Sequence, residues 1–155
     1  MGVPTVTDTY SSLFYHIVFS TKDRVPWIHS GVEQRLWQYL GGIARKNRMT
    51  AIQIGGTLDH LHALVLAPPV LSPSRIAQCL KGDSSRWIHQ EWKNFRAFAW
   101  QDGYGAFTIS KSDIINLIQY IQNQREHHRI KSFQEEYLEL LKAYGIQYDK
   151  KYIWG

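Results

Sequence analysis

Two histidines, His60 and His62, flank Leu61 within an apolar run over residues 58–67. Residues two apart on a β-strand point to the same face, so both imidazoles are expected on one side, with Cα atoms about 7 Å apart. Imidazole is a common metal ligand, and this spacing fits two ligands of one metal ion. The other interpretation is two unrelated histidines at a strand end, half solvated beside a turn.

A tyrosine and a glutamine further along the chain could complete such a site. Tyr120 and Gln124 are four residues apart in a segment with helical periodicity, which places both on one helix face. Two imidazole nitrogens and the amide oxygen of Gln124 would suit Mg²⁺ or Mn²⁺ bound together with a phosphate. Tyr120 would then attack a phosphodiester, with His127 as a candidate proton acceptor. Alternatively, Tyr120 is a ring at the core boundary with a solvated hydroxyl.

The composition of the chain is compatible with a nucleic-acid partner. The net charge is +5 and 14% of the 155 residues are aromatic, which together offer backbone contacts and stacking surfaces to single strands. No stretch of about 18 uncharged apolar residues occurs, and the polar segment 1–10 does not resemble a signal peptide, so no membrane partner is expected. The single cysteine, Cys79, excludes an internal disulfide and favours a cytoplasmic protein.

Hydrophobic periodicity predicts the elements that would position these residues. Strands are expected over residues 13–21, 50–57, 60–67 and 104–109, and helices over residues 31–48, 72–92, 111–130 and 132–144. Ser132 and Glu135 form a capping-box pattern at the start of the last helix, and Gly145 is expected to end it. Ser110 and Asp113 match the capping-box pattern only loosely.

The order of these elements predicts an α+β fold with a ferredoxin-like (split βαβ) antiparallel sheet. Helices would cover one face and leave the other free for a ligand or an added helix. The first and third strands would be central, and the C-terminal helices would carry the tyrosine. Leu61 and the alternate residues after it are apolar, so they should face the helices, while His60 and His62 face the open side. A single domain is expected over residues 1–155, with a core over about 11–110, a tyrosine helix over about 111–130 and a C-terminal helix and tail over 132–155.

Motifs along nearly the whole chain resemble those of the single-tyrosine HUH transposases, small enzymes of bacterial insertion sequences that move single-stranded DNA. The matching segments are YHIVFSTK at residues 15–22, DHLH at 59–62, LKGDSSRW at 80–87, WQDGYGAF at 100–107 and YIQNQREHH at 120–128. The tail over residues 141–152 is similar as well. The matches follow the family's order, which is more specific than any single motif.

The resemblance implies a role for each candidate residue. His60 and His62 would be the metal-binding HUH pair (histidine, hydrophobic residue, histidine), Tyr120 the nucleophile and Gln124 the third ligand. Attack by the tyrosine would join it to the 5′ side of the break and release a 3′-OH, whose later attack reseals the strand. One phosphodiester is exchanged for another, so no ATP is needed. The family also implies a homodimer in which the tyrosine can act in trans, and recognition of DNA hairpins near the element ends.

Other readings of the chain remain open from the sequence. It could be a non-catalytic, domesticated nucleic-acid-binding protein on the same fold, a relaxase or replication initiator, or a metal sensor. His16 is expected to be a core histidine. The candidates for contacts to the DNA backbone are Lys22, Arg24, Lys81, Arg86 and Arg125, each of which could equally be a solvated surface charge.

Overall fold

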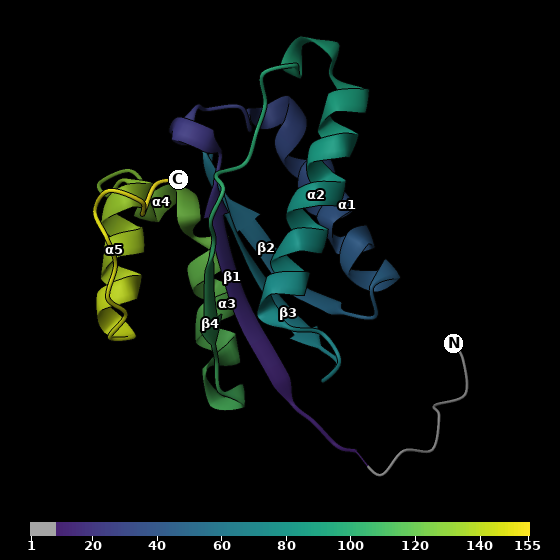
Figure 1. The fold of residues 1–155 in the computed structure, drawn as a ribbon, viewed down its shortest axis with the longest axis vertical. Helices are drawn as coiled ribbons and strands as arrows, with labels where there is room; N and C mark the ends of the chain where they lie inside the picture. The colour runs from purple at the N-terminus through teal and green to yellow at the C-terminus, as the bar shows by residue number, and fades with distance from the viewer. Residues whose placement is uncertain (1–8) are drawn as a thin grey trace.

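A four-stranded antiparallel sheet separates two groups of helices in the computed structural model, which describes residues 9–155 (Figure 1). The strands are β1 (Leu13–Ser20), β2 (Thr50–Gly56), β3 (His60–Ala67) and β4 (Gly105–Thr108), in the order β2-β3-β1-β4. The predicted central position of the first and third strands is therefore confirmed. The expectation about a signal peptide depends on a segment that lies largely outside the described residues.

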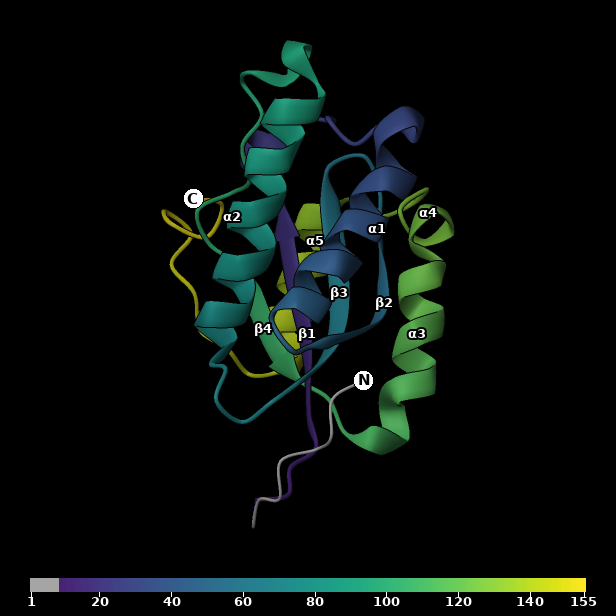
Figure 2. The same ribbon diagram turned by 90° about the vertical axis from the view of Figure 1, so that its right-hand side faces the viewer.

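Two long helices, α1 (Ser30–Lys46) and α2 (Pro73–Glu91), cover one face of the sheet (Figure 2). The main core lies between them and the strands. It contains Leu61, Ala63 and Val65 from β3, together with Ile17 and Phe19 from β1. Period-two alternation on the two central strands therefore separates a core face from a second face, as the pattern predicts.

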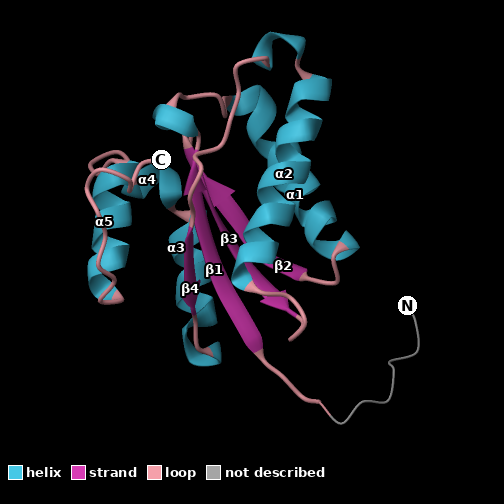
Figure 3. Cartoon of the chain, viewed as in Figure 1, coloured by secondary structure: helices cyan, strands magenta, loops and turns pink. Residues whose placement is uncertain are grey.

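The second face, expected to be free for a ligand or an added helix, is covered by three shorter helices: α3 (Ile114–Gln122), α4 (Gln124–His127) and α5 (Phe133–Ala143). Figure 3 shows the strands as one layer with helices on both sides. Leu117 and Ile121 of α3 pack against Leu64 of β3. Phe133, Tyr137 and Leu141 of α5 pack against Val18 and Phe107 on the other half of the sheet. Of the two expected occupants of this face, a ligand or an added helix, the structure shows helices, because the C-terminal helices bury apolar side chains against the sheet.

Capping residues expected from the sequence mark the start of α2 and both ends of α5. Ser72 caps α2 by accepting a hydrogen bond from the amide of Arg75 at 3.1 Å. The capping box of Ser132 and Glu135 opens α5, and Gly145 follows its end with a φ of 66°, the left-handed conformation that glycine adopts without strain. Three short 3₁₀ helices, Lys22–Arg24, Lys93–Phe95 and Lys111–Asp113, lie in the connections.

The predicted helix over residues 111–130 is interrupted. A 3₁₀ turn precedes α3, and Asn123 separates α3 from α4. At the break, the side-chain amide of Gln124 donates to the carbonyl of Tyr120 at 3.4 Å, an acceptor that a continuous helix would pair with a backbone amide. Ser110 is not a helix cap, since its hydroxyl donates to the carboxylate of Asp113 at 2.8 Å instead of accepting from a backbone amide. Within residues 9–155, no helix is both long and apolar enough to cross a membrane.

Candidate metal and tyrosine site

The histidine pair lies at the start of β3, on the face covered by α3 and α5. In the register of the sheet, His62 stands between Val18 of β1 and Gly55 of β2. Both imidazoles are fully buried, so the interpretation of two half-solvated histidines is wrong. Leu61 between them points into the opposite core, as its place in the alternation predicts.

Each imidazole of the pair has its Nδ1 atom engaged by a neighbour. Nδ1 of His60 donates to the carboxylate of Asp59 at 2.9 Å, with the hydroxyl of Thr57 at 3.0 Å. Nδ1 of His62 lies 2.8 Å from Nε2 of His16, which is buried as expected and also orients the site. Metal-binding histidines commonly have one ring nitrogen held in this way, which fixes the ring and directs the other nitrogen to the ion.

The Nε2 atoms of the pair point toward two side chains from the C-terminal helices. Nε2 of His60 lies 2.8 Å from Oε1 of Gln124, and Nε2 of His62 lies 2.8 Å from Oε1 of Glu136. The structure therefore brings Gln124 to the histidines across 64 residues of sequence. Glu136 is a residue that the sequence did not identify.

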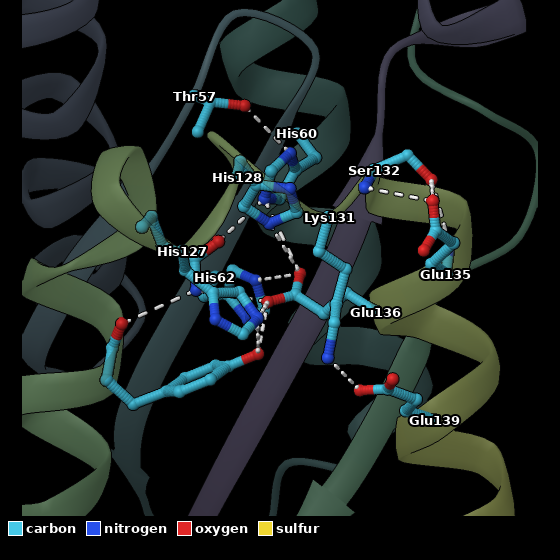
Figure 4. Close-up of polar contacts among 12 residues, drawn as sticks. Thr57, His60, His62, His127, His128, Lys131, Ser132, Glu135, Glu136 and Glu139 are labelled. Carbon is cyan, nitrogen blue, oxygen red and sulfur yellow. Dashed lines mark hydrogen bonds and ion pairs between the residues drawn. The ribbon is translucent and has the colours of Figure 1, made fainter.

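Glu136 lies on α5 at the centre of the site and is 1% exposed. Figure 4 shows its carboxylate among His60, His62, His127 and His128; these five residues are called the histidine–glutamate cluster below. The sequence carried one signal for it. Glu136 shares a helical stripe with apolar residues of α5, and a carboxylate is rarely buried without partners.

Tyr120 projects from α3 toward the same carboxylate. Its hydroxyl donates to Oε2 of Glu136, and its ring packs edge-on against His62 with centroids 5.7 Å apart. Burial raises the pKa of Tyr120 well above its ordinary value, and the negative charge of Glu136 raises it further. The phenol is therefore protonated in this arrangement, and the alternative of a solvated boundary hydroxyl does not describe it.

The last two histidines of the cluster come from α4 and the residue after it. Nε2 of His127 lies 3.3 Å from the hydroxyl of Tyr120 and 3.3 Å from Oε2 of Glu136. Nε2 of His128 lies 3.2 Å from Oε1 of Glu136, but the angles do not make a hydrogen bond. Within residues 9–155 it is the one buried side-chain polar atom that lacks such a partner. More ring nitrogen atoms therefore face Glu136 than form hydrogen bonds with its carboxylate.

The electrostatics of the cluster favour an ionised Glu136 beside a neutral His62. Burial alone would raise the pKa of Glu136, but the neighbouring imidazoles of His128 and His62 outweigh that effect and hold the pKa far below its ordinary value. Burial lowers the pKa of His62 despite the opposing charge of Glu136, and it lowers the pKa of His16 as well. Neutral imidazoles are the form that binds metals.

The donor atoms fit a divalent metal ion. Nδ1 of His60 faces the carboxylate of Asp59 as a donor, so a neutral ring would present the lone pair of Nε2 to Oε1 of Gln124, which is also an acceptor. A shared cation would stabilise two acceptors at that distance. Neighbouring ligands of an octahedral Mg²⁺ are about 3 Å apart, comparable with the 2.8 Å contacts of His60 with Gln124 and of His62 with Glu136.

The five candidate DNA contacts lie in different parts of the surface. Arg125 borders the cluster, is 71% exposed and pairs with Glu33 at 2.5 Å. Lys81 donates to the carbonyls of residues 102 and 103, and Arg24 donates to the carbonyl of residue 154. Arg86 is on α2, on the opposite side of the sheet, and Lys22 opens the first 3₁₀ turn. Of the five, only Arg125 lines the same pocket as His128 of the cluster.

An open pocket of about 700 Å³ lies beside Thr57 and Asp59, the two residues that contact Nδ1 of His60. Its lining includes Asp59 and His128 together with the cations Arg125 and Lys131. Asp59 holds His60, so the pocket reaches the residues that support the buried pair. It is large enough to admit part of a nucleotide strand next to the cluster.

Comparison with known proteins gives consistent matches. The family model described as "Transposase IS200 like" matches residues 9–124. The transposases of insertion sequence element IS200 from Salmonella typhimurium and Salmonella typhi are each 26% identical over 122 residues, covering 75% of this chain and 79% of theirs.

Two solved structures share the fold. One is a protein assigned as a transposase from Deinococcus radiodurans R1, with a TM-score of 0.61, 25% identity and coverage of 79% of this chain and 98% of that chain. The other is a REP-associated tyrosine transposase bound to a REP hairpin, with a TM-score of 0.59, 14% identity and coverage of 81% and 74%. Both likenesses confirm the α+β fold. The match to the family model, in contrast, ends at residue 124, before α5 begins.

Proposed function

Because this chain belongs to the family of IS200-like transposases, we propose that it cuts and rejoins single-stranded DNA, with Tyr120 as the nucleophile. A divalent metal, Mg²⁺ or Mn²⁺, would be held by His60, His62 and Gln124. The proposal rests on the convergence of the candidate catalytic and metal-binding groups. The phenolic hydroxyl, the two Nε2 atoms and the amide oxygen meet around one buried carboxylate, although they come from three separate elements.

The histidine pair is held ready for this role by its own neighbours. Asp59 orients His60 and His16 orients His62, so little rearrangement of the rings is needed when a ligand binds. When bound, the metal would polarise the scissile phosphate and offset the charge that develops on its oxygens.

Tyr120 performs the covalent step. Its phenolic oxygen forms a bond to phosphorus on the 5′ side of the break, and the bond from phosphorus to the 3′ oxygen breaks, so that this oxygen leaves as a 3′-OH. In the structure the phenolic hydrogen already points to Glu136, and Nε2 of His127 lies 3.3 Å from the oxygen. A later attack by a 3′-OH on the phosphotyrosine restores the phosphodiester and the free tyrosine.

The substrate strand would approach through the pocket beside Asp59 and His128. Arg125 and Lys131, which also line this pocket, are suited to backbone phosphates. The hairpin bound by the related REP-associated transposase supports a DNA hairpin as the partner of this chain. Tyr120 lies beside the histidines of its own chain, so the reaction can be completed within one chain; the homodimer with a tyrosine acting in trans stays a prediction.

A covalent-adduct assay tests the proposal. The protein is incubated with labelled single-stranded DNA from the ends of its element and Mg²⁺ or Mn²⁺, and denaturing gels are searched for a protein–DNA adduct. Wild type is expected to form it, whereas Tyr120→Phe and His62→Ala bind the DNA without forming it. Tyr152→Phe, which alters an exposed tyrosine, is the matched control and should behave as wild type.

The alternative function predicts a different result. A non-catalytic nucleic-acid-binding protein on the same fold would bind the hairpin DNA but give no adduct in wild type, and that outcome would overturn the proposal. An adduct that persists in Tyr120→Phe would show that another side chain is the nucleophile.

A further inference from the structure

Glu136 offers its two carboxylate oxygens to different parts of the cluster. Oε1 lies 2.8 Å from Nε2 of His62 and 3.6 Å from Nε2 of His60. Oε2 accepts the hydroxyl of Tyr120 and lies 3.2 Å from the side-chain amide of Gln124. One oxygen therefore faces the histidine pair, and the other faces the nucleophile on α3 and Gln124 on α4.

We propose that Glu136 is a further protein ligand of the divalent metal through Oε1, while Oε2 holds Tyr120 beside it. This inference rests on the metal site proposed above and adds a ligand from α5, which lies beyond the residues that the family model matches. A single carboxylate would then connect the metal, the tyrosine and the C-terminal helix.

The number of groups around Glu136 supports ligation. A carboxylate has about four lone-pair sites. Six side chains direct an N–H, an O–H or a ring nitrogen to within hydrogen-bond or ion-pair distance of it: Tyr120, Gln124, His60, His62, His127 and His128. Hydrogen bonding cannot satisfy all six at once, and Nε2 of His128 has none. A cation among these atoms would use the lone pairs of rings and carboxylate together.

The charge of the cluster supports the same conclusion. A carboxylate that is 1% exposed is costly unless a positive charge or several hydrogen bonds compensate it. No lysine or arginine among the described residues forms an ion pair with Glu136, whose ionic partners there are all histidines. A divalent ion would supply the compensating charge while the rings remain neutral.

The neighbours of His62 permit the tautomer that metal ligation requires, with the proton on Nδ1. In the structure Nε2 of His62 donates to Glu136, whereas ligation needs an unprotonated Nε2. The proton can then reside on Nδ1, which lies 2.8 Å from Nε2 of His16, a ring able to accept it as a hydrogen bond. Ligation thus replaces the hydrogen bond between His62 and Glu136 without leaving either ring nitrogen of His62 unpaired.

The proposal makes α5 part of the metal site. Without the metal, α5 is held to the sheet by Phe133, Tyr137 and Leu141 and by the contacts of Glu136. A metal bond to Glu136 would add a strong link between α5 and β3. Metal binding should therefore slow the opening of α5, which hydrogen exchange measures.

The experiment uses the full chain and Mn²⁺ in two measurements. Calorimetric titration gives the dissociation constant of Mn²⁺ for wild type, Glu136→Gln and Glu139→Gln. The control residue Glu139 is three positions further along α5, exposed, and paired with Lys131 at 2.6 Å. Hydrogen–deuterium exchange, with and without Mn²⁺, then follows the amides of β3 and α5 separately. Circular dichroism in a chelator establishes that each variant is folded.

In wild type, Mn²⁺ is expected to slow exchange in both β3 and α5. Glu136→Gln should raise the dissociation constant about tenfold or more, and saturating Mn²⁺ should then protect β3 but not α5. Glu139→Gln should match wild type in both measurements.

An unchanged dissociation constant in folded Glu136→Gln would overturn the inference. It would also be overturned if Mn²⁺ did not change hydrogen exchange in α5 of the wild type. This second measurement needs no folded variant. In both cases binding to the histidine pair would stand. If wild type binds no Mn²⁺ at all, the proposed metal site itself fails. An adduct that still forms in the presence of a chelator would show that separate failure.

Discussion

The hydroxyl of Tyr120 donates a hydrogen bond to the carboxylate of Glu136, across the space between α3 and α5. The two residues are 16 positions apart, and the segment between them contains His127 and His128, which face the same carboxylate. Glu136 therefore links the tyrosine helix to the C-terminal helix. The buried charge of this carboxylate and the close contact of Gly55 with α3 each have measurable consequences.

Glu136 should make the metal-free protein sensitive to acid. Its pKa lies far below the ordinary 4.5 because the imidazole contacts of His128 and His62 outweigh the effect of burial. A carboxylate with a lowered folded-state pKa contributes stability that is present above pH 4.5 and is lost as the pH falls below it, since the unfolded chain then binds the extra proton. The free energy of unfolding, measured in urea with a chelator, should fall less steeply below pH 4.5 in Glu136→Gln than in wild type. Equal slopes would show that folding does not lower the pKa of Glu136.

Two buried histidines should add to this loss at higher pH. Burial lowers the pKa of His62 and of His16 below the ordinary 6.5, so the unfolded chain binds more protons than the folded chain below pH 6.5. Stability is therefore expected to begin falling as the pH drops through 6.5, before Glu136 contributes. The same urea titrations test this, and a free energy of unfolding that stays constant between pH 6.5 and 5 would contradict it.

Gly55 should be essential for placing the tyrosine helix. A Cβ atom at this position of β2 would lie 2.9 Å from both Cγ2 and the carbonyl oxygen of Ile121, which follows Tyr120 on α3. Gly55→Ala must therefore push α3 away from the sheet, and we expect a cost of about 1–3 kcal/mol in stability together with loss of most adduct formation. In Gly41→Ala, on α1, the added Cβ has no neighbour within 4 Å, so that control should gain about 0.5–1 kcal/mol and keep full activity.

His16 should act on metal affinity without touching the metal. Its Nε2 is the partner of Nδ1 of His62, and loss of such a partner typically weakens metal binding about 10- to 100-fold. We expect His16→Phe to raise the Mn²⁺ dissociation constant by about that factor, as measured by calorimetry. Tyr15→Phe, the neighbouring position on the other face of β1, is the control. An affinity equal to that of wild type would mean that His62 needs no support from β1.

Arg125 should contribute electrostatic affinity for single-stranded DNA. It borders the pocket beside the cluster and its side chain is 71% exposed. Loss of one phosphate contact on a single strand reduces the slope of log affinity against log salt by about 0.7. Fluorescence anisotropy at several salt concentrations should show this change in Arg125→Gln. Arg129→Gln, which removes a similarly exposed arginine paired with Glu126, should keep the wild-type slope if the strand follows the pocket.

Much of the fold could be predicted from the sequence because its signals are local. The bounds of β3 were predicted to the residue, and the capping box at Ser132 begins α5 where expected. Alternation along β3 correctly assigned Leu61 to the core and His60 and His62 to the opposite face. The break at Asn123 was missed, because helical periodicity continues across it and only the competing side chain of Gln124 marks it.

The sequence by itself determined the elements and two short-range pairs of the candidate site. His60 and His62 are related by the strand period, and Tyr120 and Gln124 by the spacing of a helical turn. The tertiary structure alone decided that these pairs meet, that α3 to α5 cover the face that carries the histidine pair, and that Glu136 lies at the centre. The physical reason is that a buried charge is stabilised by partners from distant segments, and neither periodicity nor spacing encodes those contacts.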